Sequence, residues 1–180
     1  MLNKKIAAGV IVGVFMSGCV EKKASDPETI SCLNFVQGFY DWYVPVAFNA
    51  RNTPVYPTAI EKKGDIFSPE LKSQLQTNFK IYTNQGDLIK SLDFDPFLFS
   101  QDPWPAYKAA SAVLTGEKCY VSVSGVSGGK AQEISNLRAV SEKQNGKWVF
   151  VDFIYKGSNQ VEETNLLELL SEIVGSENKR

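Results

Sequence analysis

The fold is decided by the segment Asn145-Gly146-Lys147-Trp148-Val149-Phe150-Val151-Asp152-Phe153-Ile154-Tyr155. It opens with Asn-Gly, which favours the two positive-φ positions of a tight hairpin turn. The residues after the turn are apolar on both alternating faces, with Trp148, Phe150, Asp152 and Ile154 on one and Val149, Val151, Phe153 and Tyr155 on the other. A strand that is apolar on both faces is expected in the interior of a sheet.

The period of two continues upstream of this segment. Four strands are predicted, over residues 109–114, 118–126, 136–142 and 147–155, with breaks at Thr115-Gly116, Ser127-Gly128-Gly129 and Asn145-Gly146. Helical patterns flank them on both sides. Helices followed by consecutive antiparallel strands predict an α+β domain, in which N-terminal helices pack on a curved, mainly antiparallel four-stranded sheet and a C-terminal helix follows.

The first helix is predicted to begin at Asp26-Pro27, with the aspartate as N-cap and proline at the first helical position. Pro45 is expected to kink or end it. Its apolar residues recur every three or four positions and predict a core-facing stripe rather than a ligand site: Cys32, Phe35, Val36, Phe39, Tyr40, Tyr43 and Val46. A second helix is predicted from Ser68-Pro69, with a further turn or two at residues 88–92, and a last one over 162–174, ended by Gly175.

Residues 93–105 carry three prolines, which preclude a regular helix or a central strand. The segment also holds four large aromatic residues, which an exposed loop would not normally carry, so we expect it to fold back and cover one end of the core. The same four residues are the predicted contact surface: Phe94, Phe97, Phe99 and Trp104. Its aspartates lack the spacing of a calcium loop, so capping by Asp95 and Asp102 is favoured and no metal site is predicted.

The N-terminus reads as a secretory signal: Lys4 and Lys5 precede an uncharged run that ends at Met16-Ser17-Gly18-Cys19. The last four residues resemble a bacterial lipobox, which implies lipidation of Cys19. The expected organisation is therefore a signal peptide (1–18), a lipidated tether (19–26), one α+β domain (27–175) and a polar tail (176–180). Val20 favours the periplasmic face of the outer membrane, because an aspartate after the cysteine typically retains lipoproteins at the inner membrane.

Lipidation of Cys19 would leave Cys32 and Cys119 as an even pair. Both fall on predicted apolar faces, and disulfides persist in an oxidising compartment. We predict a disulfide between them, with two buried free thiols as the alternative.

The chain contains no histidine, which removes the commonest general base and the commonest transition-metal ligand. No cofactor motif is found. Loss of Lys4 and Lys5 with the signal would take the formal net charge from −1 to −3, so no basic stripe indicates nucleic-acid binding. These observations predict a protein that is not an enzyme.

Three short motifs carry a family resemblance: Phe39-Tyr40-Asp41, Asp95-Pro96-Phe97, and Trp148-Val149-Phe150-Val151-Asp152 with Tyr155. With Ser68–Leu75 they make the chain resemble the uncharacterised YbjP-like bacterial lipoproteins, within the nuclear-transport-factor-two-like, cystatin-like superfamily. The resemblance implies a cone of helices and curved sheet. Val151 stands where the family usually has the first of two acids, which argues against a role that needs an acid pair.

The favoured hypothesis is a membrane-anchored, non-catalytic binding or accessory module that docks on an envelope protein or polymer. One alternative is a small-ligand or isomerase-like pocket inside the cone, using Tyr40, Asp152 and Tyr155, since some superfamily members are such enzymes. Another is an envelope immunity or inhibitor protein.

Overall fold

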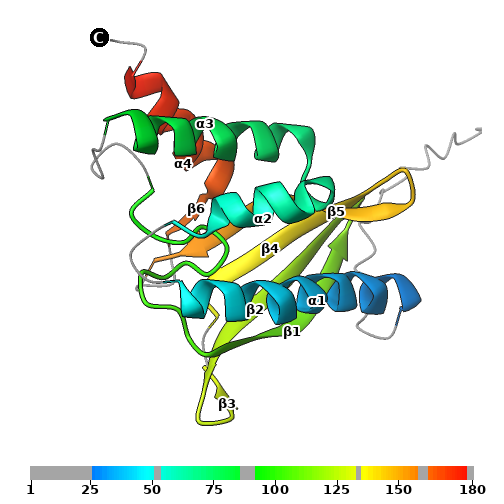
Figure 1. The fold of residues 1–180 in the computed structure, drawn as a ribbon. Coiled ribbons are helices and arrows are strands. Elements are labelled where there is room, and N and C mark those ends of the chain that lie inside the picture. The colour runs from blue at the N-terminus through cyan, green and yellow to red at the C-terminus, as the bar shows by residue number, and fades with distance from the viewer. Residues whose placement is uncertain (1–25, 51–53, 86–91, 133–134, 158–161, 178–180) are drawn as a thin grey trace, which may run out of the picture.

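The computed structural model describes residues 26–50, 54–85, 92–132, 135–157 and 162–177 (Figure 1). The predicted signal peptide, Cys19 and the predicted helical turns at 88–91 lie outside these residues. Among the described helices, none is both long enough and apolar enough to cross a membrane.

The element order confirms the α+β class. The helices are α1 (Pro27–Asn49), α2 (Tyr56–Lys63), η1 (Gly64–Ile66), α3 (Pro69–Gln85) and α4 (Leu166–Glu177). The strands are β1 (Ala106–Thr115), β2 (Lys118–Ser127), β3 (Lys130–Ala131), β4 (Leu137–Gln144), β5 (Lys147–Lys156) and β6 (Glu163–Asn165).

The sheet is open and antiparallel, in the order β1-β2-β4-β5-β6, with β3 paired to β2. Its four long strands are those predicted, and β5 is interior, between β4 and β6. The β4–β5 turn has the expected conformation, with φ of 52° at Asn145 and 78° at Gly146. The two short strands β3 and β6 were not predicted, because two or three residues are too few to show a readable alternation.

Helix α1 lies across β1 and β2 on the inner face of the sheet (Figure 1). Asp26 caps it as predicted, accepting a hydrogen bond from the Glu28 amide. The sulfurs of Cys32 and Cys119 are 2.08 Å apart, so the predicted pairing joins α1 to β2. Pro45 is exposed and lies inside the helix, which continues to Asn49. The expectation that Pro45 would end the helix is therefore wrong; packing of the following turn, including buried Ala47, sustains it.

The Gln37 side chain of α1 also supports the free edge of the sheet. Its Oε1 accepts from the Ala109 amide at 2.8 Å, and its Nε2 donates to the Tyr107 carbonyl at 3.2 Å. The register of β1 shifts between Ala109 and Ser111, next to these bonds. One side chain thus satisfies backbone groups that the edge strand would otherwise expose.

Helices α3 and α4 pack against each other at the β5–β6 side of the sheet (Figure 1). Ser68 caps α3 as predicted, its hydroxyl accepting from the Leu71 amide at 3.2 Å. The last helix begins at Leu166, because Glu163–Asn165 pair with β5 first, and it continues past Gly175 to Glu177. The predicted bounds 162–174 and the glycine cap were wrong. Leu166 and Leu170 are fully buried in the main core.

Strand β5 contains a bulge that changes which side chains face the core. Ser141 of β4 pairs with Phe150, whereas the preceding Val140 pairs with Asp152, so Val151 is an extra residue. Phe150 and Phe153 therefore both face α1 in the main core. Val149 and Val151 join Val140 in a small second cluster. Strict alternation across the whole strand was an incorrect assumption.

Candidate functional site

The loop from Leu92 to Pro105 is a folded structure closed around Asp95. Asp95 Oδ1 accepts from the backbone amides of Phe97 (2.9 Å) and Leu98 (3.2 Å). The Asp95 amide donates to the Ser100 carbonyl at 3.0 Å, and the Asp95 carbonyl accepts from Phe99 at 2.8 Å. Phe99 adopts a φ of 49°, which a bulky residue rarely does, so tertiary contacts must hold it there.

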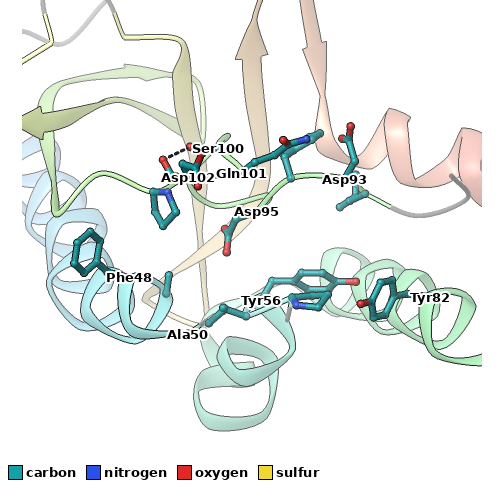
Figure 2. A pocket seen from close by; sticks show the side chains of 15 residues that line it. Phe48, Ala50, Tyr56, Tyr82, Asp93, Asp95, Ser100, Gln101 and Asp102 are labelled. Carbon is teal, nitrogen blue, oxygen red and sulfur yellow. Dashed lines mark hydrogen bonds between the residues drawn. The ribbon is translucent and has the colours of Figure 1, made fainter. Parts of the chain in front are cut away.

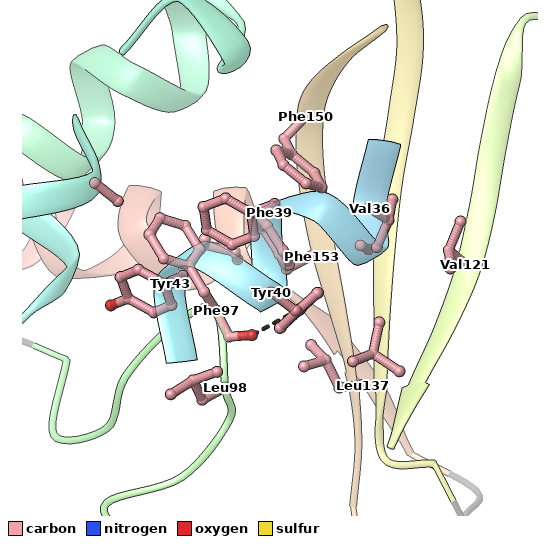
Figure 3. Close-up of a cluster of buried hydrophobic side chains, with 14 of the residues drawn as sticks. Val36, Phe39, Tyr40, Tyr43, Phe97, Leu98, Val121, Leu137, Phe150 and Phe153 are labelled. Carbon is pink, nitrogen blue, oxygen red and sulfur yellow. Dashed lines mark hydrogen bonds between the residues drawn. The ribbon is translucent and has the colours of Figure 1, made fainter. Parts of the chain in front are cut away.

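Four tyrosine hydroxyls from the surrounding elements hold this loop. Each donates a hydrogen bond to it: Tyr40 to the Phe97 carbonyl (2.8 Å), Tyr43 to Asp95 Oδ2 (2.5 Å), Tyr107 to the Leu98 carbonyl (3.3 Å) and Tyr155 to the Pro96 carbonyl (2.7 Å). Figure 3 shows the bond between Tyr40 and Phe97. We call these residues the tyrosine clamp. Because it draws on α1, β1 and β5, it fixes the loop to the helices and the sheet together.

Phe97 is the apolar centre of the loop. It is 0% exposed and contacts the rings of Phe39, Tyr43, Phe67 and Phe153 (Figure 3). Phe94 and Phe99 are partly buried, each against Tyr155. The prediction that these three phenylalanines form an exposed contact surface is therefore wrong. They pack into and against the main core instead, where burial of aromatic area stabilises the loop.

Trp104 is the member of the predicted surface that stays exposed, at 37%. Its indole lies directly over Gly125 of β2, where an added Cβ would be 2.2 Å from Trp104 Cδ1. A glycine at this position therefore leaves room for the ring to approach the backbone of the strand closely.

None of Tyr40, Asp152 and Tyr155, the residues of the predicted pocket, lines the cavities described below. Tyr40 and Tyr155 are fully buried and belong to the tyrosine clamp. Asp152 is placed by the bulge, and its Oδ1 accepts from the Leu167 amide at 3.2 Å, in the first turn of α4. Burial raises the pKa of the Asp152 carboxyl, while hydrogen bonds from the backbone amides of Phe153, Leu167 and Leu166 lower it. Its observed role is that of a helix-capping acid.

A cleft of about 580 Å³ lies between the loop and helices α1, α2 and α3 (Figure 2). Its floor comes from the end of α1, from α2 and from α3, through residues such as Ala47, Tyr56 and Tyr82. Its roof is the clamped loop, and Phe48 stands at one side, 53% exposed. The volume is in the range of ordinary ligand sites. Neither this cleft nor a smaller one of about 160 Å³ beside Trp104 is lined by Asp152.

Three carboxylates line the cleft: Asp93 and Asp102 are exposed, and Asp95 is half-buried. Burial raises the pKa of Asp95 to about 6, against the lowering effect of its bonds from Tyr43, Phe97 and Leu98. Burial likewise raises the pKa of Tyr43 well above its usual value, so its hydroxyl stays a donor to Asp95. Within the described part of the chain, no group of three or more acidic, cysteine or histidine side chains is arranged to hold a metal ion.

Comparison with known proteins gives no match. No family model fits the chain, and no curated protein and no solved structure is significantly similar to it. The resemblance to YbjP-like lipoproteins stays an expectation from the sequence. The site must therefore be interpreted from its own geometry.

The cleft was not predicted from the sequence, although parts of its wall were. Asp95 was recognised as a capping residue, and the structure confirms that role. The opposing wall combines residues from 47–50 and 54–56 with Tyr82, and no local pattern brings these segments together. The sequence did contain one indication of the cleft. Residues 100–102 of the loop are all polar, whereas a loop that only covered the core would need no such run.

Proposed function

We propose that this protein is a non-catalytic binding or accessory module of the bacterial envelope, lipid-anchored through Cys19 at the periplasmic face of the outer membrane. It docks on a partner protein through the cleft between the clamped loop and helices α1, α2 and α3. A resemblance to YbjP-like lipoproteins accords with this location. Two or more acyl chains on Cys19 would attach the protein stably to the membrane, because each buried CH₂ contributes ~0.8 kcal/mol of binding free energy.

The observation that carries the proposal is the preformed cleft. Its roof is held by the four hydroxyls of the tyrosine clamp, so little ordering is required when a ligand enters. Exposed Phe48 at the cleft offers apolar area of the kind that interface cores favour. Tyr40, Phe97 and Phe153 are buried in the core, which favours docking at the cleft over an isomerase-like pocket in the interior.

Helix α1 supplies a matched pair of variants for the test. Phe48 lines the cleft, whereas Ile30, 44% exposed, lies near the other end of the helix and outside the cleft lining. Both side chains are exposed, so truncation to alanine should leave the fold intact. Membranes from cells expressing each variant would be crosslinked, and proteins that co-purify would be quantified.

We expect Phe48→Ala to lower recovery of the partner at least several-fold, as truncation of an interface anchor does. Ile30→Ala should recover it at the wild-type level. Equal recovery by both variants, or no captured protein with the wild type, would contradict docking through the cleft.

A further inference from the structure

The domain has two distinct ends, and one of them combines the start of α1 with two hairpins. Lys118 of β2 pairs with Glu142 of β4, so the β1–β2 and β4–β5 turns lie at the same end of the sheet. The disulfide joins Cys32 of α1 to Cys119 of β2 at that end. Figure 1 shows the blue start of α1 and the β4–β5 turn on the same side of the molecule. We call this the hairpin end.

The start of α1 is also fixed to the β4–β5 hairpin. Lys143 forms a salt bridge with Glu28, and Trp148 Nε1 donates to the Ser31 hydroxyl at 3.2 Å. The Lys143 ammonium lies 5.2 Å from the centre of the Trp148 ring. Together with the disulfide, these contacts fix the first turns of α1 to the sheet. A constraint on the chain that enters α1 is therefore a constraint on the whole domain.

The cleft lies at the opposite end of the domain. Helix α1 leads to it, through the bonds of Tyr40 to Phe97 and of Tyr43 to Asp95, and Phe48 of the cleft lining is next to its last residue. The 23 residues of α1 span about 34 Å at 1.5 Å per residue. The ten residues of β5 span a similar length, about 33 Å. Roughly 30 Å therefore separates the hairpin end from the cleft.

The connection from Cys19 to the hairpin end is shorter than this separation. Residues 20–25 join Cys19 to the N-cap Asp26, and these seven steps reach at most ~25 Å even when fully extended. Acyl chains on Cys19 would therefore keep the hairpin end within ~25 Å of the bilayer. An inverted domain, with the cleft against the bilayer, would place the start of α1 about 34 Å away. The connection is too short for that arrangement.

We propose that the hairpin end faces the membrane and that the cleft opens toward the periplasmic space. The docking partner is then a soluble protein or a periplasmic domain, because a surface within the bilayer would not reach a cleft held roughly 30 Å above it. This inference rests on the proposed function and names the class of its partner.

The test measures how far three positions lie from the bilayer. The full-length mature lipoprotein would be reconstituted in vesicles whose outer headgroups carry an energy-transfer acceptor. A donor dye would be attached through Glu117→Cys or Lys147→Cys at the two hairpins, or through Gln101→Cys at the cleft; all three positions are exposed. Since Cys32 and Cys119 are paired and Cys19 would carry the lipid, the introduced thiol is the one that reacts.

We expect energy transfer to be several-fold more efficient from Glu117→Cys and Lys147→Cys than from Gln101→Cys. Insertion of about 20 glycine and serine residues after Ser25 provides the matched control, because the flexible connection can then exceed the length of α1. The domain should reorient freely in this variant, and most of the difference between the hairpin and cleft positions should disappear.

Other results overturn the inference in distinguishable ways. Equal transfer from the three positions, or more from Gln101→Cys, would refute the orientation while the anchor stands, and the Phe48 comparison would then decide on docking by itself. A difference that the longer connection leaves unchanged would refute tether length as its cause. Protein that does not float with the vesicles would contradict lipidation of Cys19, and the orientation would fail with it.

Discussion

Asp95 has two roles, as the acceptor that closes its own loop and as a half-buried carboxylate beside the cleft. Its raised pKa, about 6 against an ordinary 3.8, means that burial favours the protonated form in the folded state. Between these two values the folded protein binds more protons than the unfolded chain. The contribution of Asp95 to stability therefore falls as the pH rises from about 4 to about 6.

Asp95→Asn replaces this carboxyl with a neutral group that keeps a carbonyl acceptor for the loop amides. We expect the variant to match the wild type near pH 4 and to be more stable at pH 7. The gain should be roughly 1–3 kcal/mol, since one pKa unit corresponds to 1.36 kcal/mol and solvent screening reduces the full effect. Urea unfolding at both pH values measures it, with Asp65→Asn as the charge control. A variant less stable than the wild type at pH 7 would show that the Tyr43 hydrogen bond outweighs the cost of burial.

At the scale of elements, the bond between Cys32 and Cys119 joins the first helix to the second strand across 87 positions of sequence. Its main expected effect is on the unfolded chain, whose freedom it restricts. On the chain-entropy model a loop of this length contributes about 4–5 kcal/mol. The same bond holds α1 on the sheet and so supports Tyr40 and Tyr43 of the tyrosine clamp.

We therefore predict that reduction lowers the free energy of unfolding by about 4–5 kcal/mol, or less if residual structure persists in the reduced chain. Urea titrations of oxidised and reduced protein measure the difference, and Cys32→Ala with Cys119→Ala provides the version that cannot re-oxidise. Coincident unfolding curves, together with two alkylatable thiols in protein taken directly from cells, would refute a structural disulfide.

The elements also show which predictions the sequence can support. Long strands and capped helices were found because hydrophobic periodicity and local caps are encoded within a few residues.

Asp152 was misplaced because one bulge at Val151 reverses the alternation, and a bulge depends on the neighbouring strand. The composition of residues 93–105 predicts that the loop folds back over the core, but not which of its aromatic residues, such as Phe97, turn inward. Burial of Phe97 depends on Phe39, Phe67 and Phe153, which come from distant segments.

For the whole molecule, the proposed lipid tether at Cys19 would decide where the cleft operates. Cys19→Ala should block lipidation, and we expect the precursor to accumulate uncleaved, because the lipid-dependent peptidase requires the modified cysteine. Mass spectrometry of the N-terminal peptide and fractionation of the membranes measure both effects. Normal cleavage before residue 19 in this variant would instead indicate an ordinary secreted protein. Docking through the cleft would then have to occur without a lipid anchor.

If the proposed function is right, a partner protein occupies the cleft in the cell, and site-specific photo-crosslinking would capture it there. A photoreactive phenylalanine analogue would replace Gln101, which is exposed and lines the cleft, or Val113, which is 39% exposed on β1 and lines neither described cavity. We predict a discrete crosslinked adduct of one partner protein at Gln101 and none at Val113. Adducts of equal yield at both positions, or an adduct at Val113 alone, would contradict the account.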